Sequence, residues 1–207
     1  METQAVVPVP AELAAVKEGE AGDLDRLGGR FRAAAAADGL LDIAYRVMDS
    51  PVGPLLLAGT ERGLLRVAFD REGHDSVLES LAATISPRIL LAPARLDAAA
   101  RELGEYFALR RQAFDLPLDF RLATGFRREV LAHLPEIGYG HTASYAAVAA
   151  LTSSPRAVRA VGTACARNPL PLVVPCHRVI RSDGSWGAYL GGADAKALLL
   201  DLEAGAA

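Results

Sequence analysis

Hydrophobic and polar positions alternate in several short stretches between residues 40 and 120. Every second position from Leu41 to Val47 is a large hydrophobic residue, the period of two that is typical of a half-buried strand. Two further strands are predicted at 55–58 and 64–69, with a glycine-containing turn between them. The segment 114–120 alternates again, and its proline predicts an edge strand or a strand end.

Helical spacing of apolar residues appears within the same half of the chain. It predicts helices near residues 75–85 and 96–109. We therefore expect residues 39–121 to form a small α+β domain. Residues 1–38 stand apart, because they contain Val-Pro repeats, an alanine run and the pair Gly28-Gly29, which interrupts a helical pattern. We expect this part to be an N-terminal extension, partly helical or disordered.

The remaining residues, 122–207, predict short helices. Thr124 is a candidate N-cap for a helix over 125–134, and a second helix is expected over 144–151. Ser154 is expected to cap a third helix, with Pro155 at its first position, that runs to about residue 166. Two short helices joined by a tight turn fit a helix-turn-helix, although an ordinary αα-hairpin fits the same pattern.

The charge is unevenly distributed. The whole chain carries a formal net charge of −3, but residues 1–120 hold 13 Lys and Arg against 19 Asp and Glu, and residues 121–207 hold 9 against 6. Between residues 155 and 182 there are five arginines and no acidic residue: Arg156, Arg159, Arg167, Arg178 and Arg181. A local basic stripe on an acidic protein indicates a polyanionic partner, while a solvated arginine-rich face is the alternative.

Composition narrows the class of protein. Of the 207 residues 51% are hydrophobic and 23% are charged, which is a globular balance. No apolar stretch approaches the length of a membrane-spanning helix, and the N-terminus lacks the pattern of a secretory signal. Two cysteines do not form a disulfide framework, so we expect a reducing compartment and a cytoplasmic protein. We also expect a monomer with no membrane partner.

A cysteine and a histidine follow one another after the apolar run 170–175. Nearby positive charge favours the reactive thiolate, and Arg178 and Arg181 are close to Cys176 in sequence. Adjacent residues on an extended strand point to opposite faces, so either the chain turns at Cys176-His177 or a water relays the proton. A buried, inert cysteine is the alternative reading.

The histidines and cysteines are too scattered for a structural zinc site. There is no CxxC or HxxxH pair, so we expect neither a metal nor a cofactor. Cys165, which lies among alanines on the predicted third helix, is expected to be a packing residue. A thiol hydrolase of the papain type is a poor match, because its histidine comes from far along the chain.

One group of motifs is more specific. Its members are Pro175-Cys176-His177-Arg178-Val179-Ile180, with Arg159-Ala160-Val161-Gly162, Asn168-Pro169 and Ser144-Tyr145 before it, and Gly191-Gly192 and the segment 196–203 after it. In this order and spacing they resemble the active-site signature of the O6-alkylguanine-DNA alkyltransferases (methylated-DNA–protein-cysteine methyltransferases). The resemblance covers about residues 40–205 and is strongest from residue 126 onward.

The resemblance implies an α+β fold: a small antiparallel-sheet domain that is ribonuclease-H-like, followed by a mostly helical domain with a helix-turn-helix. It also implies a single-turnover DNA repair enzyme that removes the alkyl group from O6-alkylguanine in duplex DNA. Binding in the minor groove and flipping of the damaged nucleotide are part of that expectation, because the O6 atom is not accessible inside the duplex.

The resemblance further implies roles for particular residues. Cys176 corresponds to the alkyl acceptor, His177 to the base that acts through a water, and Glu203 to the carboxylate that orients the histidine. Asn168 corresponds to the brace of the active-site turn, and Tyr145 to the hydroxyl that supports base flipping and contacts the guanine. The implied DNA contacts are Arg159, which enters the base stack, with Arg156, Ala157, Val158, Gly162 and Tyr145. The implied guanine-binding residues are Val179, Tyr189 and Leu190, to which we add Trp186 as a candidate.

Some positions depart from the family pattern. Leu190 stands where Ser or Gly is usual, which predicts a narrower pocket or a lower tolerance of bulky alkyl groups. A lesion-binding protein of the family without chemistry is one alternative, but such proteins lack the cysteine of the motif. A thiol enzyme unrelated to DNA is another, and it would need no arginine stripe.

Overall fold

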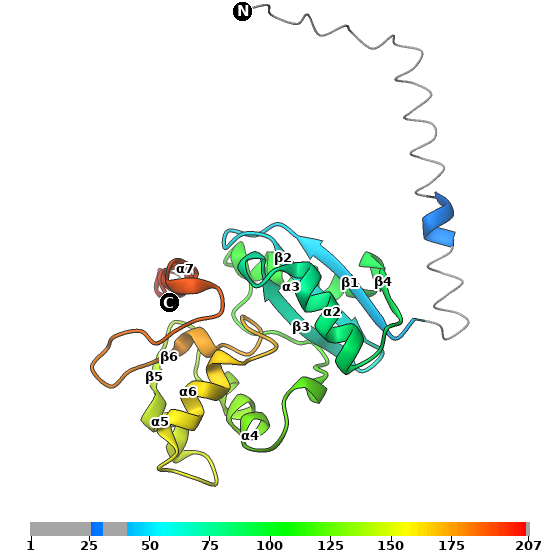
Figure 1. The fold of residues 1–207 in the computed structure, drawn as a ribbon. Coiled ribbons are helices and arrows are strands. Elements are labelled where there is room, and N and C mark those ends of the chain that lie inside the picture. Colours follow the sequence, from blue (N-terminus) through cyan, green and yellow to red (C-terminus); the bar gives the residue numbers. More distant parts are fainter. Residues whose placement is uncertain (1–25, 31–40, 206–207) are drawn as a thin grey trace, which may run out of the picture. The chain divides into compact units, whose positions relative to one another are not determined.

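The computed structural model describes residues 26–30 and 41–205 (Figure 1). The chain divides into two units, and the boundary between them in the sequence lies between Leu41 and Asp42. In the first unit residues 26–30 are helical. This turn passes through Gly28 and Gly29, so the prediction that these glycines interrupt a helix is wrong; glycine weakens a helix without forbidding it. The rest of the predicted N-terminal extension lies outside the described residues.

A four-stranded sheet opens the second unit. Its strands are β1 (Ile43–Met48), β2 (Leu55–Thr60), β3 (Gly63–Phe69) and β4 (Ile89–Leu91). The order is β3-β2-β1-β4, with antiparallel pairs except for the parallel pair β1–β4. The first three strands lie where they were predicted, but burial does not alternate along them: residues 55–58 are all buried, and Val47 is 47% exposed. The sequence pattern did not reveal β4, because three residues are too few to show a period.

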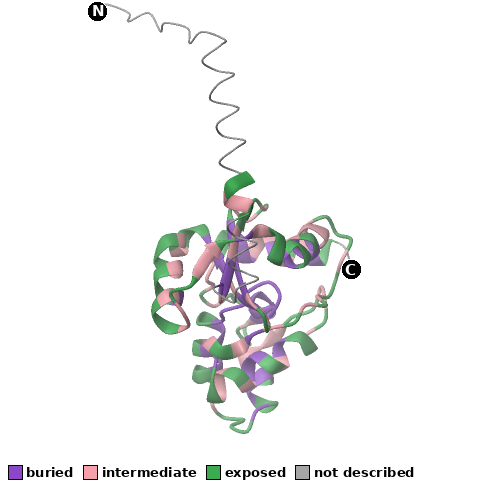
Figure 2. Cartoon of the chain, turned by 90° about the vertical axis from the view of Figure 1, so that its right-hand side faces the viewer, coloured by how far each residue is buried: buried purple, intermediate pink, exposed green. Residues whose placement is uncertain are grey.

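Helices flank the sheet, and one of them packs against the buried side chains of its strands. They are η1 (Asp70–Glu72), α2 (His74–Thr84), η2 (Pro93–Leu96) and α3 (Asp97–Phe107). Leu81 of α2 packs with Ile43, Ala58 and Leu65 of the strands in one buried cluster. In Figure 2 many of the buried residues, coloured purple, lie on these strands.

The segment 114–120 does not form the predicted edge strand. It runs beside β3 and makes a single parallel bridge, between Leu118 and Leu64. The Leu64 amide donates to the Pro117 carbonyl at 2.8 Å, and the Asp119 amide donates to the Leu64 carbonyl at 2.8 Å. Pro117 has no amide hydrogen of its own, which limits how far the ladder extends.

Short helices and a two-stranded parallel sheet make up the remaining half. The elements are η3 (Phe120–Leu122), α4 (Gly125–His133), η4 (Leu134–Glu136), β5 (Ala143–Ser144), α5 (Tyr145–Ala150), α6 (Val158–Ala166), η5 (Cys176–Arg178), β6 (Val179–Ile180) and α7 (Gly192–Ala204). Helices α5 and α6 are joined by a short turn, as a helix-turn-helix requires. A sheet region followed by a helical region is the predicted α+β class.

The predicted helix starts were right in two cases of three. Ser144 caps α5, where its hydroxyl accepts from the Ala147 amide at 3.0 Å. Thr124 occupies the N-cap of α4, but its side chain makes no capping hydrogen bond. Ser154 does not cap α6, whose N-cap is Ala157. Instead the Ala157 amide donates to the Ser154 carbonyl at 2.9 Å, which closes a separate turn around Pro155.

The sheet region holds the loop that leads to Cys176. The Val67 amide of β3 donates to the Pro169 carbonyl at 2.9 Å. The guanidinium of Arg66, which forms an ion pair with Glu72, donates to the same carbonyl at 3.2 Å. The edge strand β3 thus uses the backbone amide of Val67, which is not paired within the sheet, to hold the loop before Cys176.

Candidate active site around Cys176

A tight buried turn places the cysteine. Asn168 is 1% exposed. Its amide nitrogen donates to the Val174 carbonyl at 2.8 Å, while its side-chain oxygen accepts from the Leu170 amide at 3.0 Å. Leu172, within this turn, has a φ of +73°, a conformation that costs a non-glycine residue energy and needs such support. The geometry suits the bracing role expected of Asn168.

The chain turns at Cys176. Residues 176–178 form a 3₁₀ turn, η5, in which the Arg178 amide donates to the Pro175 carbonyl at 3.1 Å. Of the two arrangements left open by the sequence, the chain turn is therefore present. Within residues 41–205 no hydrogen bond joins the Cys176 sulfur to the His177 imidazole.

Burial keeps the thiol protonated at rest. Cys176 is 2% exposed, and this desolvation raises its pKa to about 11. The Asn168 side chain and the charge of Lys196 oppose that shift. The cation whose charge lowers the pKa of this thiol is Lys196. Of the two arginines close to Cys176 in sequence, Arg178 bonds to Glu203 and Arg181 bonds to Ser185 and Trp186. A thiol in this state needs a base to become a nucleophile.

His177 and Glu203 lie together, as the resemblance implied. The Nε2 atom of His177 is 2.9 Å from Oε1 of Glu203, and both residues are essentially inaccessible to solvent. Burial by itself raises the pKa of Glu203, but hydrogen bonds from His177 and Arg178 outweigh it and hold the pKa at about 2. The carboxylate is therefore charged, and it orients the ring.

The second ring nitrogen is available as a base. Burial lowers the pKa of His177, and the hydrogen bond to Glu203 opposes this only in part, so the ring is neutral. With its Nε2 proton directed at Glu203, the neutral ring presents Nδ1 as an acceptor. Nδ1 is buried and has no hydrogen-bond partner among the described residues.

Arg178 does not belong to the exposed basic stripe. Its Nε donates to Oε2 of Glu203 at 2.8 Å and its second terminal nitrogen donates to Oε1 at 2.9 Å, which is a bidentate pair. Its remaining nitrogen donates to the Ile137 carbonyl at 2.7 Å. The other four arginines, Arg156, Arg159, Arg167 and Arg181, are exposed. The stripe predicted from the sequence therefore has four accessible members.

A pocket of about 350 Å³ opens beside helix α6. It is lined by Tyr145, Val158, Arg159, Gly162, Ala166, Arg181, Gly187 and Ala188. A Cβ atom on Gly187 would overlap the Tyr145 hydroxyl, so this glycine lets the loop after β6 lie against the phenol. Arg181 braces that loop through the Ser185 hydroxyl at 3.2 Å and the Trp186 carbonyl at 3.0 Å.

Helix α6 and the turn before it carry most of the residues that the resemblance assigned to DNA. Arg156, Val158 and Arg159 are exposed, and Ala157 and Gly162 are half-buried. A positive surface built on small side chains can approach a groove closely. The pocket with Tyr145 lies at the same helix.

The four candidate guanine-binding residues differ in position. Val179 is fully buried in β6 and its carbonyl accepts from Lys196 at 2.7 Å. Tyr189 lies edge-on to His177, with the ring centroids 6.2 Å apart. Leu190 is half-buried, and Trp186 is 43% exposed. Of these four, none lines the pocket beside α6.

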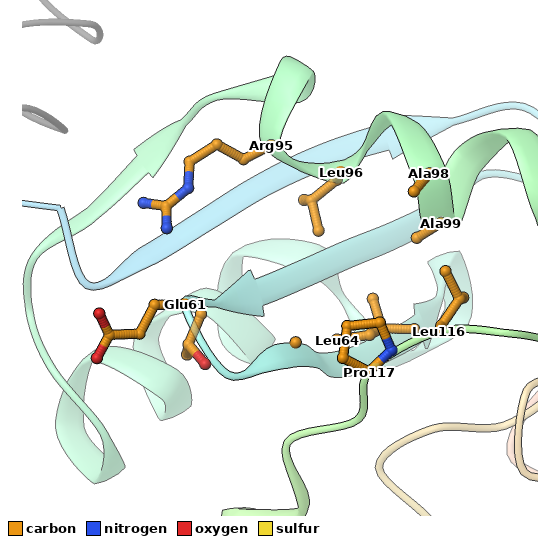
Figure 3. A pocket seen from close by; sticks show the side chains of 10 residues that line it. Glu61, Leu64, Arg95, Leu96, Ala98, Ala99, Leu116 and Pro117 are labelled. Carbon is orange, nitrogen blue, oxygen red and sulfur yellow. The ribbon is translucent and has the colours of Figure 1, made fainter.

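Another cavity, of about 300 Å³, lies in the sheet region (Figure 3). Glu61 and Arg95 stand at one end of it, and Leu64, Leu96 and Pro117 line it further along. It contains none of the predicted site residues. Across the described residues there is no group of three or more His, Cys, Asp or Glu that could hold a metal ion.

Two residues of the site were missed by sequence reasoning. Tyr106 of α3 donates its hydroxyl proton to Oε1 of Glu203 at 2.7 Å, from 97 positions away. Lys196, which belongs to the motif segment 196–203 but was given no role, is 1% exposed. No local pattern around Tyr106 marks it, whereas an isolated lysine in the apolar stretch 195–200 was a signal that could have been read.

Family models match almost all of the second unit. The model described as 6-O-methylguanine DNA methyltransferase, ribonuclease-like domain, matches residues 43–120. The model described as 6-O-methylguanine DNA methyltransferase, DNA binding domain, matches residues 125–205. The first covers the sheet region and the second covers the pocket and the cysteine.

Individual relatives agree with these models. A methylated-DNA–protein-cysteine methyltransferase of Methanosarcina barkeri is 42% identical over 159 residues, which span 77% of this chain and 96% of the relative. The crystal structure of Mycobacterium tuberculosis O6-methylguanine methyltransferase is 36% identical with a TM-score of 0.70, and the match covers 80% of this chain and 94% of that one. A structure of the M. tuberculosis OGT in complex with DNA has 38% identity and a TM-score of 0.67, covering 79% and 94%.

Proposed function

Because the chain belongs to the 6-O-methylguanine DNA methyltransferase family, we propose that it repairs O6-methylguanine in DNA by transferring the methyl group to the sulfur of Cys176. The observation that carries this assignment is the buried Cys176 on a braced turn, next to a histidine whose Nε2 is fixed by Glu203. Relatives about 40% identical are methylated-DNA–protein-cysteine methyltransferases, which supports the activity.

The reaction requires two proton transfers, one from the Cys176 thiol and one to the guanine that is released. The Cys176 thiol gives its proton, through a water, to Nδ1 of His177. The sulfur then forms a bond to the methyl carbon as the bond from that carbon to O6 breaks, and the electron pair stays on the guanine. A proton returned to the guanine balances the charge. The products are guanine and S-methylcysteine, a thioether that water does not hydrolyse, so each molecule reacts once.

DNA is the partner in this proposal. A relative has been solved in complex with DNA, and the family model over residues 125–205 is a DNA-binding domain. We propose that α6 enters the minor groove, that Arg159 takes the place of the flipped nucleotide, and that Arg156, Ala157, Val158 and Gly162 contact the backbone. The exposed arginines supply the positive charge that phosphates attract.

We propose that the flipped base enters at the pocket beside α6, which Tyr145 and Arg159 line. In this proposal Tyr145 contacts the guanine, and the main chain around Val179 and Leu190 reads its edge, with Tyr189 behind it. Removing the base from the stack is necessary, because O6 lies on the paired edge of guanine. Asn168 keeps the turn in place, and the function needs no cofactor.

One experiment tests the assignment. The protein is incubated with a duplex that contains O6-methylguanine, and the peptide that carries Cys176 is weighed. We expect a gain of one methyl group, lost in Cys176→Ala and kept in Cys165→Ala, the matched control at the other buried cysteine. A protein that binds the duplex without gaining mass would instead be a lesion-recognition protein, and one that does neither would be an unrelated thiol enzyme.

A further inference from the structure

Helix α3 of the sheet region sends one side chain into the catalytic network of the helical region. Tyr106 is fully buried, and its hydroxyl lies 2.7 Å from Oε1 of Glu203. This is the same oxygen that His177 contacts at 2.9 Å. A single carboxylate oxygen therefore links the phenol to the imidazole.

The hydroxyl acts only as a donor. Burial and the neighbouring charge of Glu203 raise the pKa of Tyr106 far above its ordinary value. The phenol is thus protonated at neutral pH. Since a carboxylate is an acceptor, the hydrogen bond has one direction, from Tyr106 to Glu203.

Other aromatic rings hold the phenol in place. Phe107 and Phe114 lie 5.3 Å and 5.5 Å from the Tyr106 ring, centroid to centroid, and Tyr139 lies 6.1 Å away. These contacts involve the ring and not the hydroxyl. Replacing Tyr106 by Phe therefore removes one hydrogen bond and keeps the packing.

Every charged or titratable neighbour of the pair can be named. Arg178 makes the bidentate ion pair with Glu203. The charge of Lys196, on α7, lowers the pKa of His177. The phenols of Tyr139, in the loop before β5, and Tyr189, in the loop between β6 and α7, lie close enough to Glu203 for its charge to raise their pKa. Among these groups Tyr139 and Tyr189 have buried hydroxyls with no partner among the described residues, so Tyr106 is the phenol that bonds to the carboxylate.

We propose that Tyr106 is a positioning residue for alkyl transfer, which fixes the Glu203 carboxylate and so sets the orientation and basicity of His177. The inference rests on the function proposed above. A hydrogen bond from the phenol draws negative charge away from Oε1. Without it the carboxylate stabilises the imidazolium more strongly, the pKa of His177 rises, and more of the base is protonated at a given pH.

The test measures the rate constant of methyl transfer as a function of pH for the wild type, Tyr106→Phe and Tyr139→Phe. For Tyr106→Phe we expect a plateau about 10-fold lower, the lower end of the loss typical when the hydrogen-bond partner behind a metal-ligating histidine is removed. We also expect the acid limb of the profile to move to higher pH. Affinity for the duplex should stay unchanged, because Tyr106 is fully buried and does not belong to the surface that we propose to bind DNA.

Tyr139→Phe is the matched control, since it removes a buried phenol oxygen that has no partner among the described residues beside the same carboxylate. Its profile should coincide with that of the wild type. An acid limb of Tyr106→Phe that coincides with the wild type, with only a lower melting temperature, would assign Tyr106 a purely structural role and overturn the proposal. A wild type that transfers no methyl group would instead overturn the function on which the proposal rests.

Discussion

The carboxylate of Glu203 is 1% exposed and accepts hydrogen bonds at both of its oxygens. Arg178 bridges the two oxygens, His177 and Tyr106 share Oε1, and the Gly140 amide reaches Oε2 at 3.3 Å. A buried ion is tolerated only when it is paired and its acceptor sites are filled. The carboxylate that we propose to orient the base is therefore also a group on which stability depends.

Glu203→Gln should lower the free energy of unfolding by about 3 kcal/mol, because it leaves the Arg178 charge buried without a counter-charge. Chemical denaturation measures this difference. Glu136→Gln is the control, since Glu136 is 58% exposed in its pair with His133 and such surface pairs contribute about 0–1 kcal/mol. Equal losses in the two variants would contradict the prediction. Methyl transfer should slow in Glu203→Gln while affinity for DNA changes little.

The same carboxylate predicts a pH dependence of stability. Its pKa falls from an ordinary value of 4.5 to about 2 in the folded protein. A depressed acid pKa stabilises the fold above the ordinary value, and that stabilisation is lost as the pH falls from 4.5 towards about 2. Unfolding measured across this range should show a steeper decline for the wild type than for Glu203→Gln. Parallel curves would mean that Glu203 does not carry the effect.

How far sequence predicts single residues depends on what marks them. Cys176, His177 and Glu203 stand in a motif with fixed spacing, so their positions could be assigned through the family. Tyr106 could not, because its partner lies 97 residues away and only the tertiary fold brings Tyr106 of α3 to Glu203 of α7. Arg178 was placed in the wrong group for a similar reason: charge along the sequence does not reveal which side chains are buried.

The loop between β6 and α7 forms part of the wall of the pocket beside α6. It runs over residues 181–191 and lies against Tyr145 at Gly187 and against Phe69 at Gly191, where a Cβ atom would be too close in each case. The strands and helices around it follow from hydrophobic periodicity. The exceptions are the strands β4, β5 and β6, which are too short to show a period, the helix α7, which was not predicted, and the start of α6, where Pro155 begins a separate turn.

Gly187→Ala tests this loop. The added methyl group would overlap the Tyr145 hydroxyl, so either the phenol or the loop must shift. We expect methyl transfer to fall about 10-fold or more, since small displacements of a reacting group are costly. Gly104→Ala is the control, because a Cβ atom there meets nothing within 4 Å and alanine favours the helix α3. Single-turnover kinetics on the lesion duplex measure both, and equal rates would contradict the prediction.

For the whole molecule, the distribution of charge separates two regions. The net charge is −3, yet Arg156, Arg159, Arg167 and Arg181 are all exposed near α6. An acidic body with a basic face orients itself on a polyanion and limits non-specific adhesion elsewhere. In the described part of the chain no helix is long and apolar enough to cross a membrane.

Arg167→Gln should weaken binding to undamaged and damaged duplexes alike, if Arg167 contacts a phosphate as proposed for this face. The slope of log K against log salt should become shallower by about 0.9 for one lost phosphate contact. Fluorescence anisotropy at several salt concentrations measures the slope. Arg101→Gln is the control, because Arg101 is exposed on α3 beside Glu105. A slope that changes in the control and not in Arg167→Gln would place the DNA on another face.

The bond between Tyr106 and Glu203 has a consequence for attempts to exchange parts of this protein with those of a relative. A chimaera that takes residues 43–120 from another source would carry the proposed nucleophile, base and carboxylate intact on its own helical half. It would still depend on the donor half for a phenol at the place of Tyr106, and for an amide at the place of Val67 to support the loop at Pro169. Chimaeras should therefore succeed or fail according to these two contacts rather than according to overall identity.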